Sequence, residues 1–393
     1  MGSVITSIAR TPIGRFGGVF APLSAVDLAT AAMVGAIERS GLEAARLDEV
    51  LMGHVIGAGT GQIPARQAAR AAGIPMTIPS TNINKVCLSG MTAIAQADKD
   101  IRLGEAAFVL AGGMESMSSA PYLTPAARWG ARMGDAVMVD AMNHDGLFCS
   151  LDRCMMGDST DTKSRALEIG REAQDAWSAE SHLRAAAATE SGHFAAEIVP
   201  VPVPQRKGDP VVVERDEGIR PDSSPEGLAR LRPAFSPEGT VTAGNASQIS
   251  DGAAALVVAE RDAAEATGLP ILAEILSYGQ IGGPDPSLHE RPAEALGVAL
   301  KKIGMSPTDL EIVEINEAFA AVALWSAAML GIAHDRVNVH GGAVALGHPL
   351  GATGARIVVT LINALRARGG GVGAATLCGG GGQGDALILQ VEA

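Results

Sequence analysis

Residues 80–90 read Ser-Thr-Asn-Ile-Asn-Lys-Val-Cys-Leu-Ser-Gly, a short strand pattern that runs into Cys87 and then into a helical pattern at residues 89–103. Residues 372–384 read Val-Gly-Ala-Ala-Thr-Leu-Cys-Gly-Gly-Gly-Gly-Gln-Gly, a second strand pattern that runs into Cys378. Strand and helix patterns alternate around both stretches. This alternation predicts a layered α/β fold.

The elements around the two stretches follow the same order. In the first third we expect a turn at Gly112-Gly113, strands at residues 4–9, 49–55, 80–85 and 106–111, and helices at 27–40, 62–72 and 89–103. In the last third we expect strands at residues 310–315, 336–340 and 372–377, and helices at 292–303, 318–330 and 352–366. This pattern favours a duplicated chain with parallel sheets and right-handed crossovers over chance similarity between two α/β stretches.

The segment between the two halves has a different composition. Residues 118–160 are rich in Met, Gly and Asp, residues 164–192 form one helical pattern, and residues 198–250 are rich in Pro and charge. Residues 250–259 then return to an apolar strand pattern. A long segment with little regular structure is unusual inside a compact domain, so we expect a functional excursion over a site.

Length and charge limit the class of protein. A chain of 393 residues with 47% hydrophobic and 19% charged residues is expected to form two or three soluble domains. The net charge of −13 argues against general nucleic-acid binding, which requires a basic face, although local Lys and Arg residues can still bind an anionic ligand. No apolar run approaches the roughly 20 residues of a membrane helix, and the N-terminus has no secretory pattern.

The chain has four cysteines: Cys87, Cys149, Cys154 and Cys378. Four are too few for a disulfide scaffold in a chain of this length, so a reducing, cytoplasmic compartment is expected. Cys149 and Cys154 have no matching second pair, and we therefore expect no zinc or other metal site.

Cys87 directly follows a strand pattern and precedes a helical one. The N–H groups and dipole of a helix N-terminus stabilise a thiolate, which is the nucleophilic form of cysteine, so Cys87 is a candidate for covalent catalysis. A buried structural cysteine is the alternative.

His348 and Cys378 each lie in a glycine-rich stretch. His348 stands between Gly347 and Pro349, in a sequence typical of an irregular loop that approaches a ligand closely. Cys378 opens a run of glycines whose backbone N–H groups suit an anion or a developing oxyanion, and a flexible turn is the alternative. No Lys-Ser or Lys-Thr follows this run, so it is not a phosphate-binding nucleotide loop.

Asn316 closes another strand pattern. Its amide is able to orient a water or donate to an oxygen, although helix capping is the simpler interpretation. Each of these residues is expected to follow a strand at its C-terminal end, which is where open α/β sheets bind ligands. Together they predict a nucleophile with partners for proton transfer.

The sequence strongly resembles the thiolase family over its full length. The resemblance is carried by six segments in the family's order: residues 84–90, 111–117, 239–252, 316–320, 347–351 and 378–384. It implies a five-layer αβαβα fold of duplicated βαβαβαββ halves, with an N-terminal half at residues 1–262, a loop domain inserted at about 118–249, and a C-terminal half at 268–393. It also implies acyl-coenzyme A substrates, no separate cofactor, and a homodimer or homotetramer.

The resemblance also implies roles for the candidate residues. Cys87 would be acylated, His348 would take its proton, and Cys378 would remove an α-proton from a second thioester. Asn316, through a water and together with His348, would hold one thioester oxygen, and the N–H groups of Cys87 and Gly380 would hold the other. Further residues at positions that match coenzyme A contacts in the family are Ser247, Arg220, Phe235, Ala243, Met156 and Phe319.

Three residues depart from the family pattern. Leu88 and Met155 stand where smaller or histidine side chains are common, and Gly379 stands where a larger residue is common. The first two are expected to reshape the acyl pocket. The wording of residues 84–87 and 339–344 resembles acetoacetyl-type members, which condense two acetyl-coenzyme A molecules.

Other functions fit parts of the same pattern. A 3-ketoacyl-coenzyme A thiolase of fatty-acid breakdown would share the residues and have a longer pocket. A ketosynthase-type condensing enzyme would have a histidine at the position of Cys378. A non-catalytic acyl-coenzyme A-binding protein would have lost one of the site residues, and a redox sensor would use Cys149 and Cys154 as an exposed thiol pair.

Overall fold

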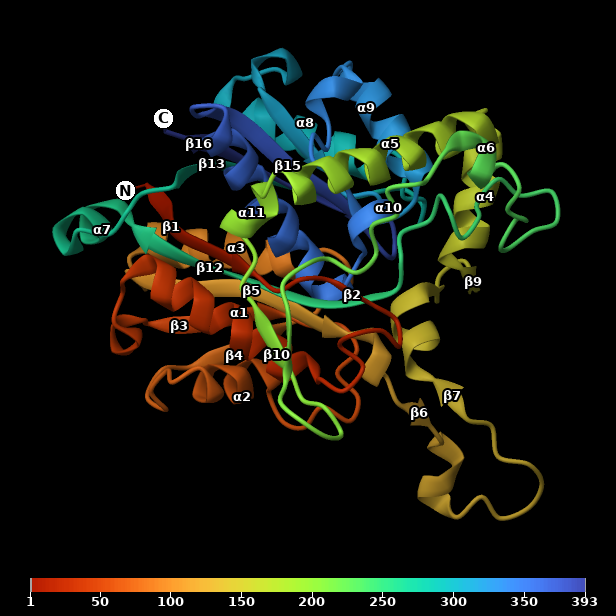
Figure 1. Ribbon diagram of the computed structural model, residues 1–393, viewed down its shortest axis with the longest axis horizontal. Helices are drawn as coiled ribbons and strands as arrows, with labels where there is room; N and C mark the ends of the chain where they lie inside the picture. Colours follow the sequence, from red (N-terminus) through yellow and green to blue (C-terminus); the bar gives the residue numbers. More distant parts are fainter. Residues whose placement is uncertain (1, 393) are drawn as a thin grey trace.

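The computed structural model describes residues 2–392 and consists of two similar α/β halves and a long insertion (Figure 1). The N-terminal half contains β1 (Ser3–Arg10), α1 (Ala25–Ser40), β3 (Glu49–Gly53), α2 (Pro64–Ala71), β4 (Ser80–Ile83), α3 (Ser89–Leu103), β5 (Phe108–Ser116) and β12 (Ser250–Glu260). The C-terminal half contains β13 (Ala273–Gly282), α8 (Arg291–Ile303), β14 (Ile312–Ile315), α9 (Ala320–Leu330), α10 (Ala343–Leu346), α11 (Leu350–Ala367), β15 (Gly371–Gly379) and β16 (Gln383–Val391).

The strands of each half form a mixed sheet. In the N-terminal half the order is β1-β12-β5-β3-β4, and in the C-terminal half it is β14-β15-β16-β13. The two sheets meet where β1 and β13 pair over only two residue pairs. β3 is parallel to β4 and β5, and β14 is parallel to β15, but β5–β12 and β15–β16 are antiparallel. The predicted all-parallel sheets are therefore wrong.

The last two strands of each half are equivalent, but the segments that connect them differ. β15 and β16 are joined by a three-glycine turn, which is possible only between antiparallel strands. β5 and β12 are the corresponding strands of the N-terminal half, and the whole insertion lies between them. The insertion thus occupies, in the N-terminal half, the place of the tight hairpin turn of the C-terminal half.

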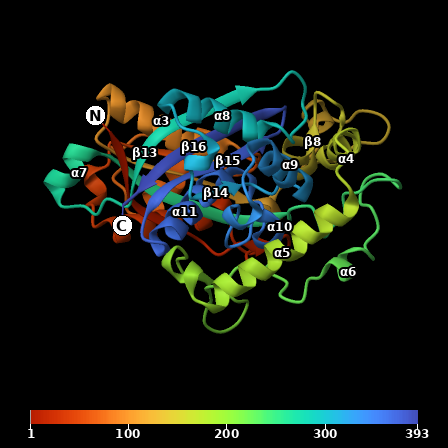
Figure 2. The same ribbon diagram turned by 90° about the horizontal axis from the view of Figure 1, so that it is seen from above.

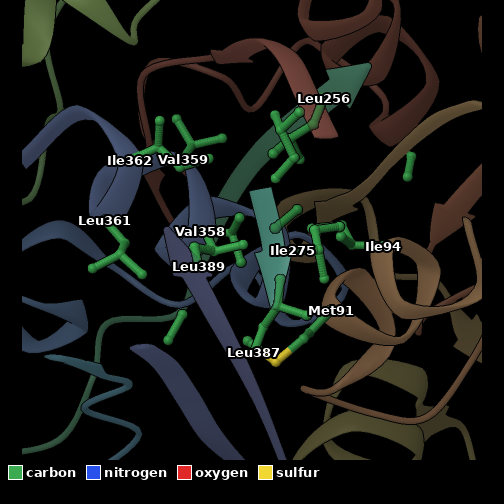
Figure 3. Close-up of a cluster of buried hydrophobic side chains, with 14 of the residues drawn as sticks. Met91, Ile94, Leu256, Ile275, Val358, Val359, Leu361, Ile362, Leu387 and Leu389 are labelled. Atoms are coloured by element: carbon green, nitrogen blue, oxygen red, sulfur yellow. The ribbon is translucent and has the colours of Figure 1, made fainter. Parts of the chain in front are cut away.

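The two halves form the predicted five layers, with α3 and α11 in the central layer (Figure 1), and Figure 2 looks down on the outer layer that contains α8 and α9. α1 and α2 pack on the outer face of the N-terminal sheet, and α8 and α9 pack on the outer face of the C-terminal sheet. Residues 350–365 of α11 are all buried. A helix that is buried on every side belongs in the middle of a protein, and the apolar side chains of α3 and α11 interdigitate with those of β12, β13 and β16 (Figure 3).

The insertion consists of short elements that surround two longer helices. These helices are α4 (Met156–Ala166) and α5 (Arg171–Glu190). The short elements are β6 (Tyr122–Leu123), β7 (Val139–Asp140), β8 (Phe148–Cys149), β9 (Cys154–Met155), β10 (Val201–Val203), β11 (Val211–Val213) and α6 (Pro225–Leu228). The segment that includes β6 and β7 extends away from the body as an arm (Figure 1).

Three predicted elements differ from the structure. The expected turn at Gly112-Gly113 lies inside the fully buried strand β5, where Gly113 packs against the carbonyl of Gly351. The glycine is needed for close approach rather than for a turn. The expected helix at residues 164–192 is two helices, interrupted where Glu168 has a φ of 55°. The expected strand at residues 336–340 is irregular, because Asn338 has a φ of 46° and its side chain bonds the backbone of Ile315.

No helix of the described residues is long and apolar enough to cross a membrane.

Candidate active site

Cys87 lies in a strained turn between β4 and α3. Val86 has a φ of 51°, a conformation that is costly for a β-branched residue and that persists only where the surroundings enforce it. The Ser89 hydroxyl supplies part of that support, since it accepts from Lys85 N at 2.8 Å and donates to Val86 O at 2.6 Å. Lys85 Nζ also pairs with Asp385 Oδ1 of β16 at 2.7 Å. The nucleophile loop is thereby attached to the C-terminal half.

Cys378 lies inside β15 rather than after it, opposite Gly384 of β16. The thiol is buried, and Cys378 is the second-last residue of β15, just before the glycine turn of the hairpin. The backbone N–H of Gly380 lies near enough to Cys87 to lower the pKa of that thiol. The glycine run therefore presents a bare N–H group beside the nucleophile.

His348 follows the short helix α10, not a strand as expected. Gly347 before it has a φ of 111° and packs against Ser250, so a side chain there would be strained and would clash. His348 Nδ1 lies 2.6 Å from Thr353 Oγ1, and that hydroxyl donates to Pro349 O at 3.0 Å. Because the Thr353 hydroxyl donates its hydrogen to Pro349 O, it accepts a hydrogen bond from Nδ1–H of His348. The neutral imidazole therefore has its lone pair on Nε2. Nε2 has no hydrogen-bond partner within residues 2–392.

The two thiols, the imidazole and the glycine run line one cavity of about 60 Å³. Cys87, His348, Cys378 and Gly380 all contribute to its surface. Its apolar walls come from both halves and the insertion: Val86, Leu147, Met156, Leu288, Ala318, Phe319 and Leu350. The structure therefore brings four of the five predicted catalytic positions to the surface of a single cavity.

Asn316, the fifth position, is not among the residues that line this cavity. It follows β14 directly, its backbone N–H donates to Thr376 O at 3.0 Å, and it does not cap α9, which begins at Ala320. Its side chain is fully buried, and neither amide atom has a hydrogen-bond partner among the described residues. Buried amides are normally paired, so this one is suited to a water or a substrate oxygen.

Burial dominates the protonation of the site. It raises the pKa of Cys87 to about 11, against the lowering effect of the Gly380 N–H. Burial, with the Cys87 sulfur, also raises the pKa of Cys378, and burial with the charge of Arg356 lowers the pKa of His348 to about 3. Burial of Cys87 therefore opposes the stabilisation of a thiolate that a helix N-terminus provides. Both cysteines are neutral thiols at rest, next to a neutral imidazole that is able to accept a proton.

A second cavity of about 510 Å³ adjoins the first and shares Leu147, Met156, Ser247, Ala318 and Phe319 with it. All six residues predicted to contact coenzyme A line this outer cavity: Ser247, Arg220, Phe235, Ala243, Met156 and Phe319. Its volume lies within the range of sites that enclose a drug-sized ligand. Arg15 and Arg220 both line it, so two cationic side chains border this cavity of an acidic protein.

The predicted departures have a different role from the one expected. Leu88 lines neither the inner nor the outer cavity. It is fully buried and packs against Gly379. Met155 lines the outer cavity only, so it does not border the inner cavity that holds the two thiols. Sequence reasoning missed Thr353, although its position five residues after His348 in a helical pattern could have indicated it.

Cys149 and Cys154 are directly opposite each other in the β8–β9 hairpin. Burial and neighbouring acidic groups raise the pKa of Cys154, which opposes formation of a reactive thiolate. Leu147, which directly precedes β8, and Met155 of β9 line the cavities. The hairpin thus contributes to the walls of the site.

Comparison with known proteins agrees with this geometry. The thiolase N-terminal domain family matches residues 3–262, and the thiolase C-terminal domain family matches residues 269–391. A probable acetyl-CoA acetyltransferase of Mycolicibacterium smegmatis is 49% identical over 98% of this chain and 100% of its own length. The Escherichia coli acetyl-CoA acetyltransferase is 48% identical over 98% of both chains.

A solved structure has the same fold. The crystal structure of the Bacillus anthracis acetyl-CoA acetyltransferase superposes with a TM-score of 0.97 and 42% identity, covering 99% of this chain and 98% of that one. The predicted fold class is confirmed. Because both halves match and the similarity extends over nearly the whole chain, this protein belongs to the thiolase family.

Proposed function

We propose that the protein is an acetyl-CoA C-acetyltransferase, which reversibly condenses two acetyl-CoA molecules to acetoacetyl-CoA and free CoA. The observation that carries the proposal is the shared cavity of Cys87, His348, Cys378 and Gly380, at the inner end of the larger cavity. The names of the full-length relatives support the same activity.

Acylation begins with two neutral thiols. His348 Nε2 takes the proton of Cys87 as its sulfur attacks the thioester carbon of the first acetyl-CoA. The N–H groups of Cys87 and Gly380 receive the developing oxyanion. The C–S bond to coenzyme A breaks, and the leaving thiolate takes the proton of Cys378. The products are acetyl-Cys87, free CoA, a Cys378 thiolate and a protonated His348, so charge and protons balance.

Condensation uses the thiolate that acylation leaves behind. The raised pKa of Cys378 makes this thiolate a strong base, and it removes an α-proton from the second acetyl-CoA. His348 and a water held by Asn316 stabilise the enolate oxygen. The carbanion attacks the acetyl carbon, the bond to Cys87 breaks, and Cys87 recovers its proton from His348. Thiolysis is the same path in reverse, and neither direction as proposed uses a metal or a separate cofactor.

The size of the inner cavity supports a short acyl group. About 60 Å³ is far below the roughly 300–1,000 Å³ of sites that enclose whole drug-sized ligands. Its walls are large side chains, including Leu147, Met156, Leu288 and Phe319. A long 3-ketoacyl chain would require several of them to move, whereas an acetyl group would not.

Mass spectrometry after brief exposure to acetyl-CoA tests the assignment. The wild type is expected to gain one acetyl group on Cys87, and Cys87→Ser is expected to gain no thioester. Cys378→Ala is still expected to form acetyl-Cys87, more slowly because Cys378 no longer protonates the leaving thiolate. Its condensation rate is expected to fall by at least about a hundredfold, the lower end of the contribution of a positioned acid–base group. An acetyl group on Cys149 or Cys154, or faster turnover of long-chain than of acetoacetyl thioesters, would overturn the proposal.

We also propose a cytoplasmic homodimer or homotetramer. Four free cysteines support a reducing compartment. The arm at residues 118–141 carries Trp129 and Met133, which are 80% and 97% exposed, and such an apolar surface on an extended segment supports self-association. Light scattering of the whole chain is expected to give a dimeric or tetrameric mass that Trp129→Asp with Met133→Asp reduces. A monomeric wild type would contradict the assembly.

A further inference from the structure

Glu115 of β5 is fully buried, and within residues 2–392 it makes no hydrogen bond to Cys87, Cys378 or His348. Three backbone N–H groups donate to it: Gly351 and Val55 to Oε2 at 2.9 and 3.1 Å, and Ile56 to Oε1 at 3.1 Å. His54 Nε2 lies 3.4 Å from Oε1, and burial lowers the pKa of His54 to about 4, so this neighbour is neutral. Burial raises the pKa of Glu115 to about 7 against the lowering effect of these three N–H groups, so the carboxylate form prevails above that pH. A buried carboxylate with three backbone partners holds those backbones in a defined arrangement.

One of those backbones belongs to the His348 loop. Gly351 is in the first turn of α11, three residues after His348, and no side chain of the helix's own N-cap residue, Pro349, caps that turn. The carboxylate of Glu115 satisfies an otherwise unpaired N–H and complements the positive end of the helix. The cap thus comes from the opposite half of the molecule.

Glu115 Oε2 is also connected to the Cys87 loop by hydrogen bonds. Val55, which donates to Oε2, accepts from Asn84 Nδ2 at 3.2 Å through its carbonyl. Asn84 Oδ1 in turn accepts from Val86 N at 3.1 Å, and Val86 is the strained residue before Cys87. A continuous series of hydrogen bonds therefore joins Gly351 to Val86 through Glu115.

A second buried glutamate shows what is particular to Glu115. Glu317 accepts from Val344 N at 3.0 Å, before His348, and from Trp177 Nε1 and Ser181 Oγ of α5. It holds the start of the His348 loop to the insertion. The hydrogen bonds of Glu115 join the end of that loop to the nucleophile.

We propose that Glu115 is a positioning residue that sets the distance between the Cys87 sulfur and His348 Nε2. This inference rests on the proposed roles of those two residues. Glu115 does not touch the reacting atoms. It acts because His348 is able to take the thiol proton only when the two loops keep hydrogen-bonding separation.

Glu115→Gln tests the role with little change of volume. The amide has one acceptor oxygen, and its NH₂ group must face at least one of the three N–H donors. Asn84→Ala removes the hydrogen bonds of an exposed residue in the same series. It is the alternative test if Glu115→Gln does not fold. Asp48→Asn is the control, because Asp48 Oδ2 also accepts two backbone N–H groups, from Ala107 and Phe108, at the opposite end of β3.

The readout is the rate of Cys87 alkylation by iodoacetamide between about pH 6 and pH 9, together with KM and kcat. Glu115→Gln and Asn84→Ala are expected to slow alkylation near neutral pH by about 10- to 100-fold, to shift the pH profile toward that of His348→Asn, and to lower kcat with KM unchanged. Asp48→Asn is expected to leave all three as in the wild type.

A folded Glu115→Gln protein with the wild-type alkylation profile and kcat would overturn the inference. So would a non-folding Glu115→Gln combined with an Asn84→Ala protein that behaves as wild type. Failure of the proposed function looks different, since the wild type itself would then form no acetyl-Cys87 and condense no acetyl-CoA.

Discussion

A Cβ atom on Gly379 would lie 2.6 Å from Cγ of Leu88. The residues that directly follow the two site cysteines are thus in contact, and the side chain of one occupies the space that a side chain of the other would need. Leu88 is fully buried, so it has little room to withdraw. The large residue after Cys87 and the glycine after Cys378 are complementary parts of one packing arrangement.

Gly379→Ala is expected to lower the free energy of unfolding by about 1–3 kcal/mol, because an extra methyl group overpacks a tight site. It is also expected to reduce condensation by displacing Cys378. Leu88→Ala alone is expected to cost about 2–5 kcal/mol through its cavity. The double variant should cost less than the sum of the two. Urea denaturation of the four proteins measures the coupling, and additive effects would contradict it.

Gly297→Ala provides the matched control. Gly297 is an exposed residue of α8, and a Cβ atom there would meet no atom within 4 Å. The substitution is expected to stabilise the protein by about 0.5–1 kcal/mol, the usual gain from replacing a glycine within a helix.

Thr353→Val is expected to lower kcat on the order of a hundredfold with KM unchanged. The methyl group cannot accept from His348 Nδ1, so the imidazole loses the contact that selects its tautomer and orientation. Thr353→Ser keeps the hydroxyl and is expected to recover most of the activity. Steady-state kinetics of both variants checks this, and a Thr353→Val enzyme with normal kcat would refute the tautomer assignment.

Gly157→Ala is expected to raise the KM for acetyl-CoA several-fold and to leave Cys87 alkylation unchanged. A Cβ atom at this position would collide with the ring of Phe235, which lines the outer cavity and not the inner one. Gly170→Ala, in open space at the start of α5, is the control and should leave KM unchanged. A loss of alkylation in Gly157→Ala would show that the two cavities are not separable.

Stability is expected to fall as the pH falls from about 6.5 toward 4. Burial lowers the pKa of His54, His182 and His289 to about 4 and of His348 to about 3, from 6.5. Between those values the unfolded chain binds more protons than the folded one, so acid favours unfolding. Burial raises the pKa of Glu115 to about 7 and of Glu314 to about 8, which opposes the trend with fewer groups. Urea midpoints near pH 7 and pH 5 measure the slope, and an equal midpoint would contradict it.

Much of the site could be read from the sequence because its signals are local. A strand shortly before Cys87, a helix that starts at Ser89 and a glycine run after Cys378 are patterns of adjacent residues. The repeated element order likewise predicted two similar halves, since each pattern is set by the spacing of its own apolar side chains. The five layers were implied by the resemblance to the thiolase family.

Only the tertiary structure decided how those elements meet. Gly113 looks like a turn residue until α11 approaches β5, and Glu115 looks like an ordinary acidic residue until Gly351 and Val55 donate to it. The neutral state of both thiols was equally hidden, because local sequence predicts a helix N-terminus but not the depth of burial that outweighs it. Contacts between residues hundreds of positions apart, and the desolvation they cause, depend on the packing of the whole chain and leave no local pattern.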